Sequence, residues 1–445
     1  MIAILFEDEL WRNFTPLIYT RPIFDLRCGA FSLRERVTAF FAANAPQDQP
    51  KVLGLCRPYL MDCYGPQGGL RTFLSKSAPL TFLNGRTLDP SWLPALLEEP
   101  LETVYSAGGI LLGARLSPAL ASAILYYLRE QRATEALEEL QRFARVVEIP
   151  APLLLYPWDL ISQVGEQIIR DLPLLTPRIP RYVQTESTLV VRGAANLYVA
   201  PTAQLEGPLV LDARNGPIII DEKAHLEPFT FIQGPAYIGV GSLISSAKLR
   251  GETSIGPVCR IGGEVEASIV QGFSNKHHDG FLGHSWLGEW VNVGALATNS
   301  DLKNTYGPIR VVIEGLGQVN SGTQKLGCFL ADHVKLGIGL HLTGGAVIGV
   351  GSNLFGVHMV PKTVPPFTWG SEVFREYRID GMIEVTRKVM SRRNQVMSPA
   401  YEAMLRTVFL LTRNSRGGLG PVPRQGLFGG RNERDDGPGG QLLRL

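Results

Sequence analysis

Apolar residues recur at every sixth position along much of the chain between residues 188 and 370. The positions are Val199, Leu205 and Leu211, then Ile220, Leu226, Ile232, Ile238 and Ile244, and later Leu330, Leu336, Leu342, Ile348 and Leu354. A helix would give a period of 3.6 and a flat strand a period of 2. A period of six fits one face of a triangular solenoid, in which three repeats complete a coil and the apolar side chain points inward. The pattern therefore predicts a β-helix of hexapeptide repeats over residues 188–370.

The first 150 residues alternate short apolar runs with helical patterns, which is typical of an α/β domain. Strands are expected at 2–6, 52–56, 80–85 and 108–114, and helices at 33–43 and 117–146. Ser32 and Glu35 form a capping box before the first helix. Ser117 followed by Pro118 is a typical start for the second.

Three further segments complete the expected organisation. Residues 151–187 form a connector with a helix after Pro157. Residues 371–413 return to helical patterning. Residues 414–445 are rich in Gly, Arg, Pro and Asp, and we expect this tail to be disordered because it offers little apolar surface to bury.

The composition excludes several classes of protein. Of the 445 residues 45% are hydrophobic, which is enough for sizeable cores and rules out global disorder. Lys and Arg total 43 against 41 Asp and Glu, so the net charge of +2 gives no bulk attraction for nucleic acid. There is no apolar run long enough to span a membrane, and the N-terminus meets an acidic residue at Glu7, unlike a signal peptide. We therefore expect a cytoplasmic protein without membrane or nucleic-acid partners.

The five cysteines are scattered and lack any C-x-x-C pair, so neither a zinc site nor a disulfide framework is indicated. We expect incidental thiols in a reducing compartment.

A polar, histidine-rich segment is expected to interrupt the solenoid between about 270 and 325. It contains His277, His278, His284, Asn292, Asn299, Asp301 and Lys303. Solenoid coils need only small and apolar residues, so such a break marks a candidate site. A neutral imidazole there could deprotonate an amine or hydroxyl that attacks a thioester. The alternative is that these histidines cap turns or bind bridging waters.

The segment FLGHSWLGEWVNVGALATNSD, residues 281–301, resembles the acetyltransferase site of the bifunctional N-acetylglucosamine-1-phosphate uridyltransferase family. The resemblance implies that His278 is the catalytic base and that Asn292 contacts the sugar phosphate. It also implies that Gly294 and Ala295 line the thioester of acetyl-CoA, while Asn299 or Asp301 takes the place of a later asparagine.

The sequence departs from the family pattern at three positions of this site. Phe281 replaces a tyrosine, His284 an aspartate and Leu296 a glycine.

Basic residues on or after the last coils, Lys325 among them, could hold the phosphates of coenzyme A. A solvated helix face explains most of these basic positions equally well, and we prefer that interpretation for residues 387–393.

The start of the chain, LFEDELWRNFTPLIYTRPIFDLRCG, lacks the glycine-rich loop with which sugar nucleotidyltransferases cradle nucleotide phosphates. Over most of residues 1–400 the chain resembles a branch of that family with the same two-domain plan. This resemblance implies that Arg12, Arg21 and Arg27 clamp phosphates in place of the loop. Alternatively, these arginines are solvated or form structural pairs with Asp8, Glu9 and Asp25.

The classical family binds magnesium through an aspartate at the position of Asn84, in the segment FLNGR. Because asparagine is a poor replacement for a metal-binding carboxylate, we expect Asn84 to lie near the nucleotide phosphates and assign Mg²⁺ to Asp25 and Asp159.

Together these features predict an α/β nucleotidyltransferase-like domain followed by a left-handed parallel β-helix that forms a homotrimer. The expected activity joins a nucleoside triphosphate to a sugar 1-phosphate, with acyl transfer from acetyl-CoA or another acyl-CoA in the β-helix. One alternative is a non-catalytic protein that binds a nucleotide sugar and uses the solenoid only for assembly. Another is a β-helix acyltransferase whose first domain merely docks the substrate.

Overall fold

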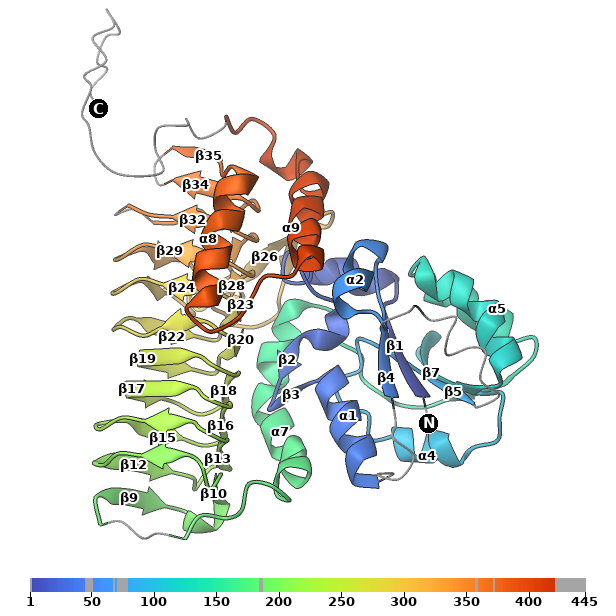
Figure 1. Ribbon diagram of the computed structural model, residues 1–445, viewed down its shortest axis with the longest axis horizontal. Coiled ribbons are helices and arrows are strands. Elements are labelled where there is room, and N and C mark those ends of the chain that lie inside the picture. Colours follow the sequence, from blue (N-terminus) through green and yellow to red (C-terminus); the bar gives the residue numbers. More distant parts are fainter. Residues whose placement is uncertain are drawn as a thin grey trace, which may run out of the picture.

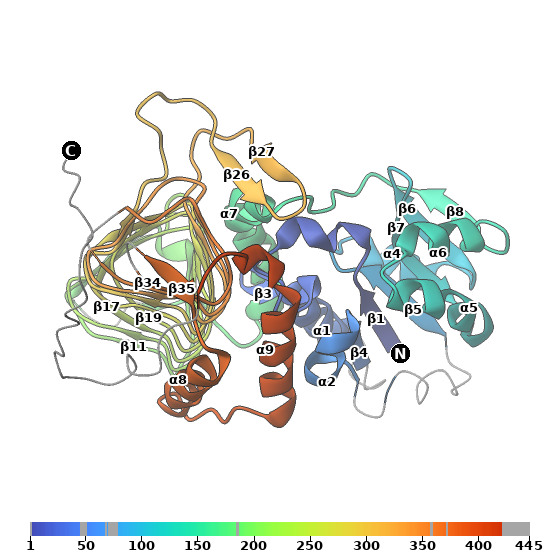
Figure 2. The ribbon, with the colours of Figure 1, turned by 90° about the horizontal axis from the view of Figure 1, so that it is seen from above.

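The computed structural model describes residues 2–44, 51–66, 69, 79–183, 187–356, 359–370 and 373–420. An α/β domain lies beside a long stack of β-helix coils, with helix α7 (Pro157–Leu175) between them (Figure 1). Seen along the stack, the coils superpose into a rounded triangle (Figure 2).

The first domain is built on a mixed sheet of strand order β4-β1-β5-β7-β6-β8. Strand β1 is a continuous apolar run, as expected for a parallel strand covered on both faces. The strands are β1 (Ile2–Phe6), β4 (Lys51–Leu55), β5 (Leu80–Asn84), β6 (Thr103–Ala107), β7 (Ile110–Leu116) and β8 (Arg145–Glu148). The helices are η1 (Glu9–Phe14), η2 (Ile23–Asp25), α1 (Leu33–Asn44), η4 (Pro58–Leu60), α2 (Met61–Tyr64), α4 (Leu93–Glu98), α5 (Pro118–Arg129) and α6 (Ala133–Leu140).

The predicted capping box of α1 is present: the Ser32 amide donates to the Glu35 carboxylate at 2.7 Å, and the Glu35 amide donates to the Ser32 hydroxyl at 3.3 Å. The prediction of helix throughout 117–146 is wrong. Helix α5 ends at Arg129, where Gln131 takes a positive φ of 54°, and residues 145–148 pair with β6 as strand β8. Pairing along an open sheet edge thus outweighs the local helical pattern.

Helix α7 fastens the first domain through a buried carboxylate. The Arg36 guanidinium donates to Asp171 at 2.7 and 3.0 Å, and the Ala30 amide donates to the same side chain at 2.8 Å. Gly29, with φ +76°, allows this approach, since a Cβ there would lie 2.4 Å from the Asp171 carboxylate.

The predicted six-residue period is confirmed by three columns of inward-facing side chains, one on each face of the β-helix. Parallel pairing stacks Val199, Ile220 and Ile238 in one column, Leu226 and Ile244 in a second, and Leu211 and Ile232 in a third. All of these hexad positions are buried except Leu205, which is half-buried and lies in the first coil. The predicted fold class, an α/β domain followed by a left-handed parallel β-helix, is confirmed.

One face of the β-helix, which we call the docked face, packs against the first domain. Its strands are β10 (Leu197–Val199), β13 (Ile218–Ile220), β16 (Ala236–Ile238), β18 (Thr253–Ile255), β20 (Ile269–Gly272), β23 (Trp286–Glu289), β28 (Phe329–Leu330), β31 (Val347–Ile348) and β33 (Thr363–Val364). Here most of the outward residues are apolar too: Tyr198, Ile219, Tyr237, Trp286 and Phe329 join the core of the first domain and α7.

The other two faces carry polar residues outside and apolar residues inside. Their shorter strands are β9 (Leu189–Arg192), β11 (Gln204–Leu205), β12 (Leu209–Asp212), β14 (His225–Leu226), β15 (Phe231–Gln233), β21 (Asn275–Lys276), β22 (Phe281–Gly283), β24 (Asn292–Val293), β25 (Thr298–Asn299), β29 (Lys335–Leu336), β30 (His341–Leu342), β32 (Asn353–Leu354), β34 (Thr368–Gly370) and β35 (Phe374–Glu376). Strands β17 (Leu243–Leu249) and β19 (Arg260–Glu266) continue round a corner and belong to both faces.

The expected interruption of the solenoid at 270–325 is narrower than predicted. Coils continue through β20 to β25, and β23 pairs directly with β28, so that only residues between Asn299 and Phe329 leave the stack. That excursion forms an antiparallel hairpin of β26 (Arg310–Ile313) and β27 (Gly317–Asn320), which reaches the first domain, where the Tyr19 hydroxyl donates to Glu314. The sequence predicted that the histidines lie in the interruption, because a coil with polar residues resembles a loop in sequence.

Two helices, α8 (Ile379–Ser391) and α9 (Pro399–Leu411), close the chain against the upper coils (Figure 1). The prediction of disorder from residue 414 is wrong for the first part of the tail. Residues 414–416 form a 3-10 turn, and the Arg416 guanidinium is buried against Glu376 and the Phe409 carbonyl. Residues 421–445 of the predicted tail lie outside the described residues.

The two domains are joined by buried charges. Arg21, in the loop after β1, donates to Asp332 at 2.5 Å and to Glu289 at 3.2 Å, and both carboxylates belong to the β-helix. The Thr20 hydroxyl adds a bond of 2.5 Å to Asp332. Arg21 and Asp332 are 3% and 0% exposed, so neither charge is hydrated in the folded protein.

Within the described ranges, none of the helices combines the length and apolar character that crossing a bilayer requires.

Replacing Arg21 with alanine leaves the buried Asp332 carboxylate and the half-buried Glu289 carboxylate without a cation. We expect Arg21→Ala to lower the free energy of unfolding by about 3–5 kcal/mol, measured by urea titration with circular dichroism. The control is Arg170→Ala on α7, whose pairs with Asp89 and Glu166 are solvent-exposed. It should cost at most about 1 kcal/mol. Equal losses in both variants would contradict a dominant role for the buried pair.

Candidate active sites

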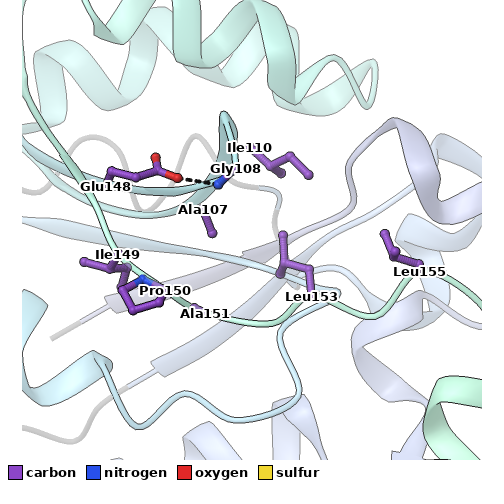
Figure 3. Close-up of a pocket in the computed structure, with 9 residues that line it drawn as sticks. All are labelled: Ala107, Gly108, Ile110, Glu148, Ile149, Pro150, Ala151, Leu153 and Leu155. Atoms are coloured by element: carbon purple, nitrogen blue, oxygen red, sulfur yellow. Dashed lines mark hydrogen bonds between the residues drawn. The ribbon is translucent and has the colours of Figure 1, made fainter.

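The carboxyl edge of the first sheet is the expected ligand site of an open α/β fold. A crevice of about 570 Å³ lies along this edge, beyond the ends of β6 and β8 (Figure 3). We call it the sheet-edge crevice. It is lined by Ala107, Gly108, Ile110, Glu148, Ile149, Pro150, Ala151, Leu153 and Leu155.

Glu148 is the charged group of this lining. Its carboxylate accepts from the Ser106 hydroxyl at 2.5 Å and from the Gly108 amide (Figure 3 draws the second bond). These hydrogen bonds lower the pKa of Glu148, so the carboxylate is ionised at neutral pH. A carboxylate on an apolar wall suits hydroxyl groups of a sugar and not a phosphate.

Beside the crevice, three polar residues are sealed inside the sheet edge. The Arg86 guanidinium donates to the Asp8 carboxylate at distances of 2.6 to 2.9 Å. The Asn84 amide donates to Asp8 and to the Leu111 carbonyl, both at 2.9 Å. Asn84 and Arg86 are fully buried, so the geometry does not support the predicted contact of Asn84 with phosphates.

The arginines expected to clamp phosphates differ in what they contact. Arg21 is committed to the interdomain carboxylates. Arg27 is buried, pairs with Glu35 at 3.0 Å and donates to the Gln271 carbonyl of the β-helix. Their predicted role as phosphate clamps is therefore corrected to a structural one, because each cation already has partners.

Arg12 remains available. It is exposed on η1, and its guanidinium lies 5.4 Å from the Trp11 ring centroid. Helix η1 borders the sheet-edge crevice because the Asn13 amide donates to the Leu155 carbonyl at 3.0 Å.

The predicted magnesium ligands do not form a centre. Asp25 makes a two-point pair with Arg34 at 2.8 and 3.0 Å, and burial raises the pKa of its carboxyl despite that cation. Asp159 caps α7 by accepting from the Leu155 and Tyr156 amides. No cluster of three metal-ligating side chains occurs in the part of the chain that the structure describes. The residues therefore do not fit Mg²⁺, and we assign it no step.

In the β-helix, residues 277–280 form a corner that we call the histidine corner. It follows Lys276, which occupies an inward position stacked on Ile261 of the preceding coil and is 1% exposed. The Lys276 ammonium donates to the Gly262 and His278 carbonyls, both at 2.7 Å. Burial lowers the pKa of Lys276 to about 8.

This buried lysine fixes the backbone that carries the histidines. His278 is exposed and His277 half-buried, with ring centroids 5.1 Å apart. Gly262 lets the coil below approach closely, since a Cβ there would lie 1.9 Å from the His277 carbonyl. The result is an accessible imidazole on a rigid coil.

A second crevice, of about 470 Å³, adjoins the histidine corner, and we call it the corner crevice. It is lined by Phe229, Phe231, Ser246, Ala247, Lys248, Gly263, Glu264, Asp279, Gly280 and Phe281. Lys248 lies 3.6 Å from Glu264, which Arg250 also contacts at 2.7 Å. Opposite charges and aromatic rings beside an imidazole can bind a polar, ring-shaped acceptor.

The other predicted residues of the acyl site are dispersed. Asn292 is exposed but lines a different crevice, under α8. Gly294 permits close stacking on Gly337, and the Ala295 carbonyl accepts from the Gly339 amide. A single chain therefore does not bring His278 and Asn292 to one site.

Two more predicted residues have structural contacts. Asn299 is buried, and its side chain bonds the Gly283 amide and carbonyl at 3.0 Å, which ties two coils together. Lys325 is exposed and pairs with Glu266 at 3.3 Å.

Nearby, the His284 Nδ1 atom lies at hydrogen-bond distance, 2.7 Å, from the Asp301 carboxylate. Although burial opposes it, His284 lowers the pKa of the Asp301 carboxyl.

Residues 3–179 match the family model described as sugar nucleotidyl transferase. The first domain is similar to that family over this range. The bifunctional sugar-1-phosphate nucleotidylyltransferase/acetyltransferase of Sulfurisphaera tokodaii is 33% identical over 152 residues, covering 34% of this chain and 38% of that protein. The bifunctional protein GlmU of Acidithiobacillus ferrooxidans is 32% identical over 165 residues, covering 36% and 30%. The matches thus span well under half of these relatives.

Among solved structures, the UDP-N-acetylglucosamine acyltransferase of Francisella novicida is similar at 10% identity. The match covers 53% of this chain and 95% of that one, with a TM-score of 0.27.

Sequence reasoning missed Glu148 in the first domain, and Lys248, Glu264 and Asp279 in the β-helix. The signal for Lys248 and Glu264 is visible in retrospect: charged residues alternate with inward positions along β17 and β19. Glu148 gave no such signal, because the helix predicted over 117–146 covered the start of its strand and hid the strand end.

Lys276 gives a measurable pH dependence of stability. Between its folded pKa of about 8 and the ordinary lysine value of 10.5, the unfolded chain binds more protons, so stability rises with pH. From pH 8 to 10, we expect the free energy of unfolding of the wild type to rise relative to that of Lys276→Met. The rise should be at most about 1.4 kcal/mol per pH unit. Urea titrations at each pH measure this. Parallel profiles for the two proteins would contradict a buried, titrating Lys276.

Proposed function

We propose that the first domain transfers a nucleotidyl group from a nucleoside triphosphate to a sugar 1-phosphate, and so makes a nucleotide sugar. The observation that carries this proposal is the match of residues 3–179 to the sugar nucleotidyl transferase family, together with an open crevice at the carboxyl edge of that domain's sheet. An oxygen of the sugar phosphate attacks the α-phosphorus, and pyrophosphate leaves from the opposite side.

The described side chains give each part of this reaction a place. The sheet-edge crevice takes the sugar, whose hydroxyls donate to Glu148. Arg12, on the bordering helix η1, is the accessible cation for the phosphates. Positioning of the two substrates supplies much of the catalysis in such a displacement.

For the β-helix we propose acyl transfer from acetyl-CoA or another acyl-CoA to an amine. His278 takes a proton from the amine as the nitrogen attacks the thioester carbonyl, and passes it to the departing thiolate, leaving an amide and free coenzyme A. The support is an accessible imidazole on a braced corner, next to a crevice with charged and aromatic walls.

We further propose that the protein is a cytoplasmic homotrimer. Phe229, Leu296 and Ile338 are 77%, 64% and 73% exposed along the corner that carries His278. The Leu296 amide donates to the Asp279 carbonyl, which places this apolar edge beside the histidine corner. A neighbouring copy on that edge would cover the apolar side chains and supply a second wall to the site.

The alternative from another class is a non-catalytic protein that binds a nucleotide sugar. The sealed Asp8–Arg86 pair and the scarcity of cations near the sheet-edge crevice favour it, and the accessible His278 argues against it for the β-helix.

Pyrophosphate release tests the first activity. The purified protein is combined with magnesium, the common nucleoside triphosphates and glucose-, mannose-, glucosamine- or N-acetylglucosamine-1-phosphate. We expect release with one pair, and a roughly 10- to 100-fold lower kcat/KM in Arg12→Ala, from the loss of a charge-assisted bond. Arg142→Ala, at another exposed arginine of the same domain, is the control. No release from folded protein with any pair would favour the non-catalytic alternative.

Acyl transfer is tested by the release of free thiol from acetyl-CoA with glucosamine 1-phosphate as acceptor. His278→Ala should lower kcat by about 10²–10⁴-fold, the usual contribution of a general base. His225→Ala, at a half-exposed histidine of the lower coils paired with Glu206, should leave the rate unchanged. Equal rates for the wild type and His278→Ala would show that this histidine is not the base.

A further inference from the structure

A third crevice, of about 310 Å³, lies between the β-helix and helix α8. We call it the α8 crevice. Its walls come from β21, β24 and β29 on one side and from α8 and the residues just after it on the other. Neither proposed activity uses this space, although it contains Asn292. The volume lies near the small end of the range for small-molecule sites, about 300–1,000 Å³.

The α8 crevice gathers positive charge without neutralising it. Lys335, Arg392 and Arg393 line it, and Arg260 is close enough for its charge to act on Arg393. Among the described residues none of these four side chains forms an ion pair with a carboxylate. Elsewhere in the protein the buried arginines Arg21, Arg36, Arg57 and Arg86 are all paired with acids. In the α8 crevice, by contrast, Arg392 is exposed and Arg393 and Lys335 are half-buried, so an anion from solvent can reach them.

The surroundings of two of these cations disfavour their charge. Burial lowers the pKa of Lys335 to about 7, and its amine donates to the Trp290 carbonyl. Burial, together with the charges of Arg260 and Arg392, lowers the pKa of Arg393. An anion between them would remove this cost, because it would pair with several cations at once.

The crevice also holds neutral donors and an aromatic wall. Asn275 lies opposite Asn292 on adjacent coils, and its amide carbonyl already accepts from Arg393 at 2.8 Å, which orients the guanidinium. Phe273 and Trp290 stack with centroids 4.5 Å apart. Amide and guanidinium donors around a small space match the oxygens of a phosphate group.

We propose that the α8 crevice binds a compact phosphate or diphosphate anion, separately from both proposed active sites. Lys335, Arg392 and Arg393 supply the charge, and the Asn275 and Asn292 amides supply further hydrogen bonds. The enclosed volume favours a small ligand over whole coenzyme A.

Lysine footprinting with acetic anhydride and mass spectrometry tests this on the full chain. At pH 7.5 Lys335 is partly neutral and reacts. Pyrophosphate is added at about ten times its own dissociation constant, with EDTA present to remove metal ions. It should slow the labelling of Lys335 about tenfold by mass action. The exposed Lys223, on the lower coils, should react equally with and without the anion. Because the readout is at Lys335, pyrophosphate bound to the first domain does not affect it.

The variants locate the effect. Arg393→Ala should weaken protection about 10- to 100-fold. Arg393→Lys should retain part of it. In the control Arg387→Ala, on α8 near Arg393 but paired with Glu402, pyrophosphate should protect Lys335 as in the wild type. Unchanged labelling of Lys335 at millimolar pyrophosphate would overturn the proposal, as would full protection in Arg393→Ala. Protection by coenzyme A but not by pyrophosphate would also overturn it, by assigning the crevice to the acyl donor.

Discussion

The buried contact of Arg21 with Asp332 and Glu289 sets the arrangement of the whole molecule. It joins the loop after the first strand to coils more than 260 residues later in the chain. Buried charges tolerate little displacement, because each depends on its partner for the interactions that water would otherwise provide. The loop is therefore held on the β-helix, and its arginine is removed from the group that could contact a nucleotide.

Apolar packing makes up most of the interface between the two domains, and the Arg21 contact fixes how they align. On the docked face the inward residues and most of the outward residues are apolar, as in Ile218–Ile220 or Trp286 and Leu287. The outward ones meet α7 and the first domain in a common core. One face of the triangle is thus covered by the chain itself, and the upper part of a second lies under α8. The corner with His278 and its exposed apolar edge stays open for a neighbour.

Charge is distributed unevenly over the surfaces that remain. At the sheet edge the acid Asp8 neutralises Arg86, and a lone Glu148 lines the crevice. Acids and bases alternate beside the histidine corner, whereas under α8 bases gather without acids. The three crevices therefore differ in the ligands they suit: hydroxyl-rich, mixed and anionic. Two lysines have different roles in these crevices: the buried Lys276 braces a backbone corner, and the half-buried Lys335 lines a cavity.

The sequence alone determined the repeat, the α/β plan and the helix starts at Leu33, Pro118 and Pro157, because inward positions and caps are local patterns. It also singled out His278. The tertiary structure decided which arginine is free, because Arg12, Arg21 and Arg27 look alike in sequence and differ only in the partners that folding brings to them. It likewise separated Asn292 from His278, since residues fourteen positions apart on a solenoid can lie on different faces. The sequence determines which charged side chains are present, but the role of each depends on the partners that folding places next to it.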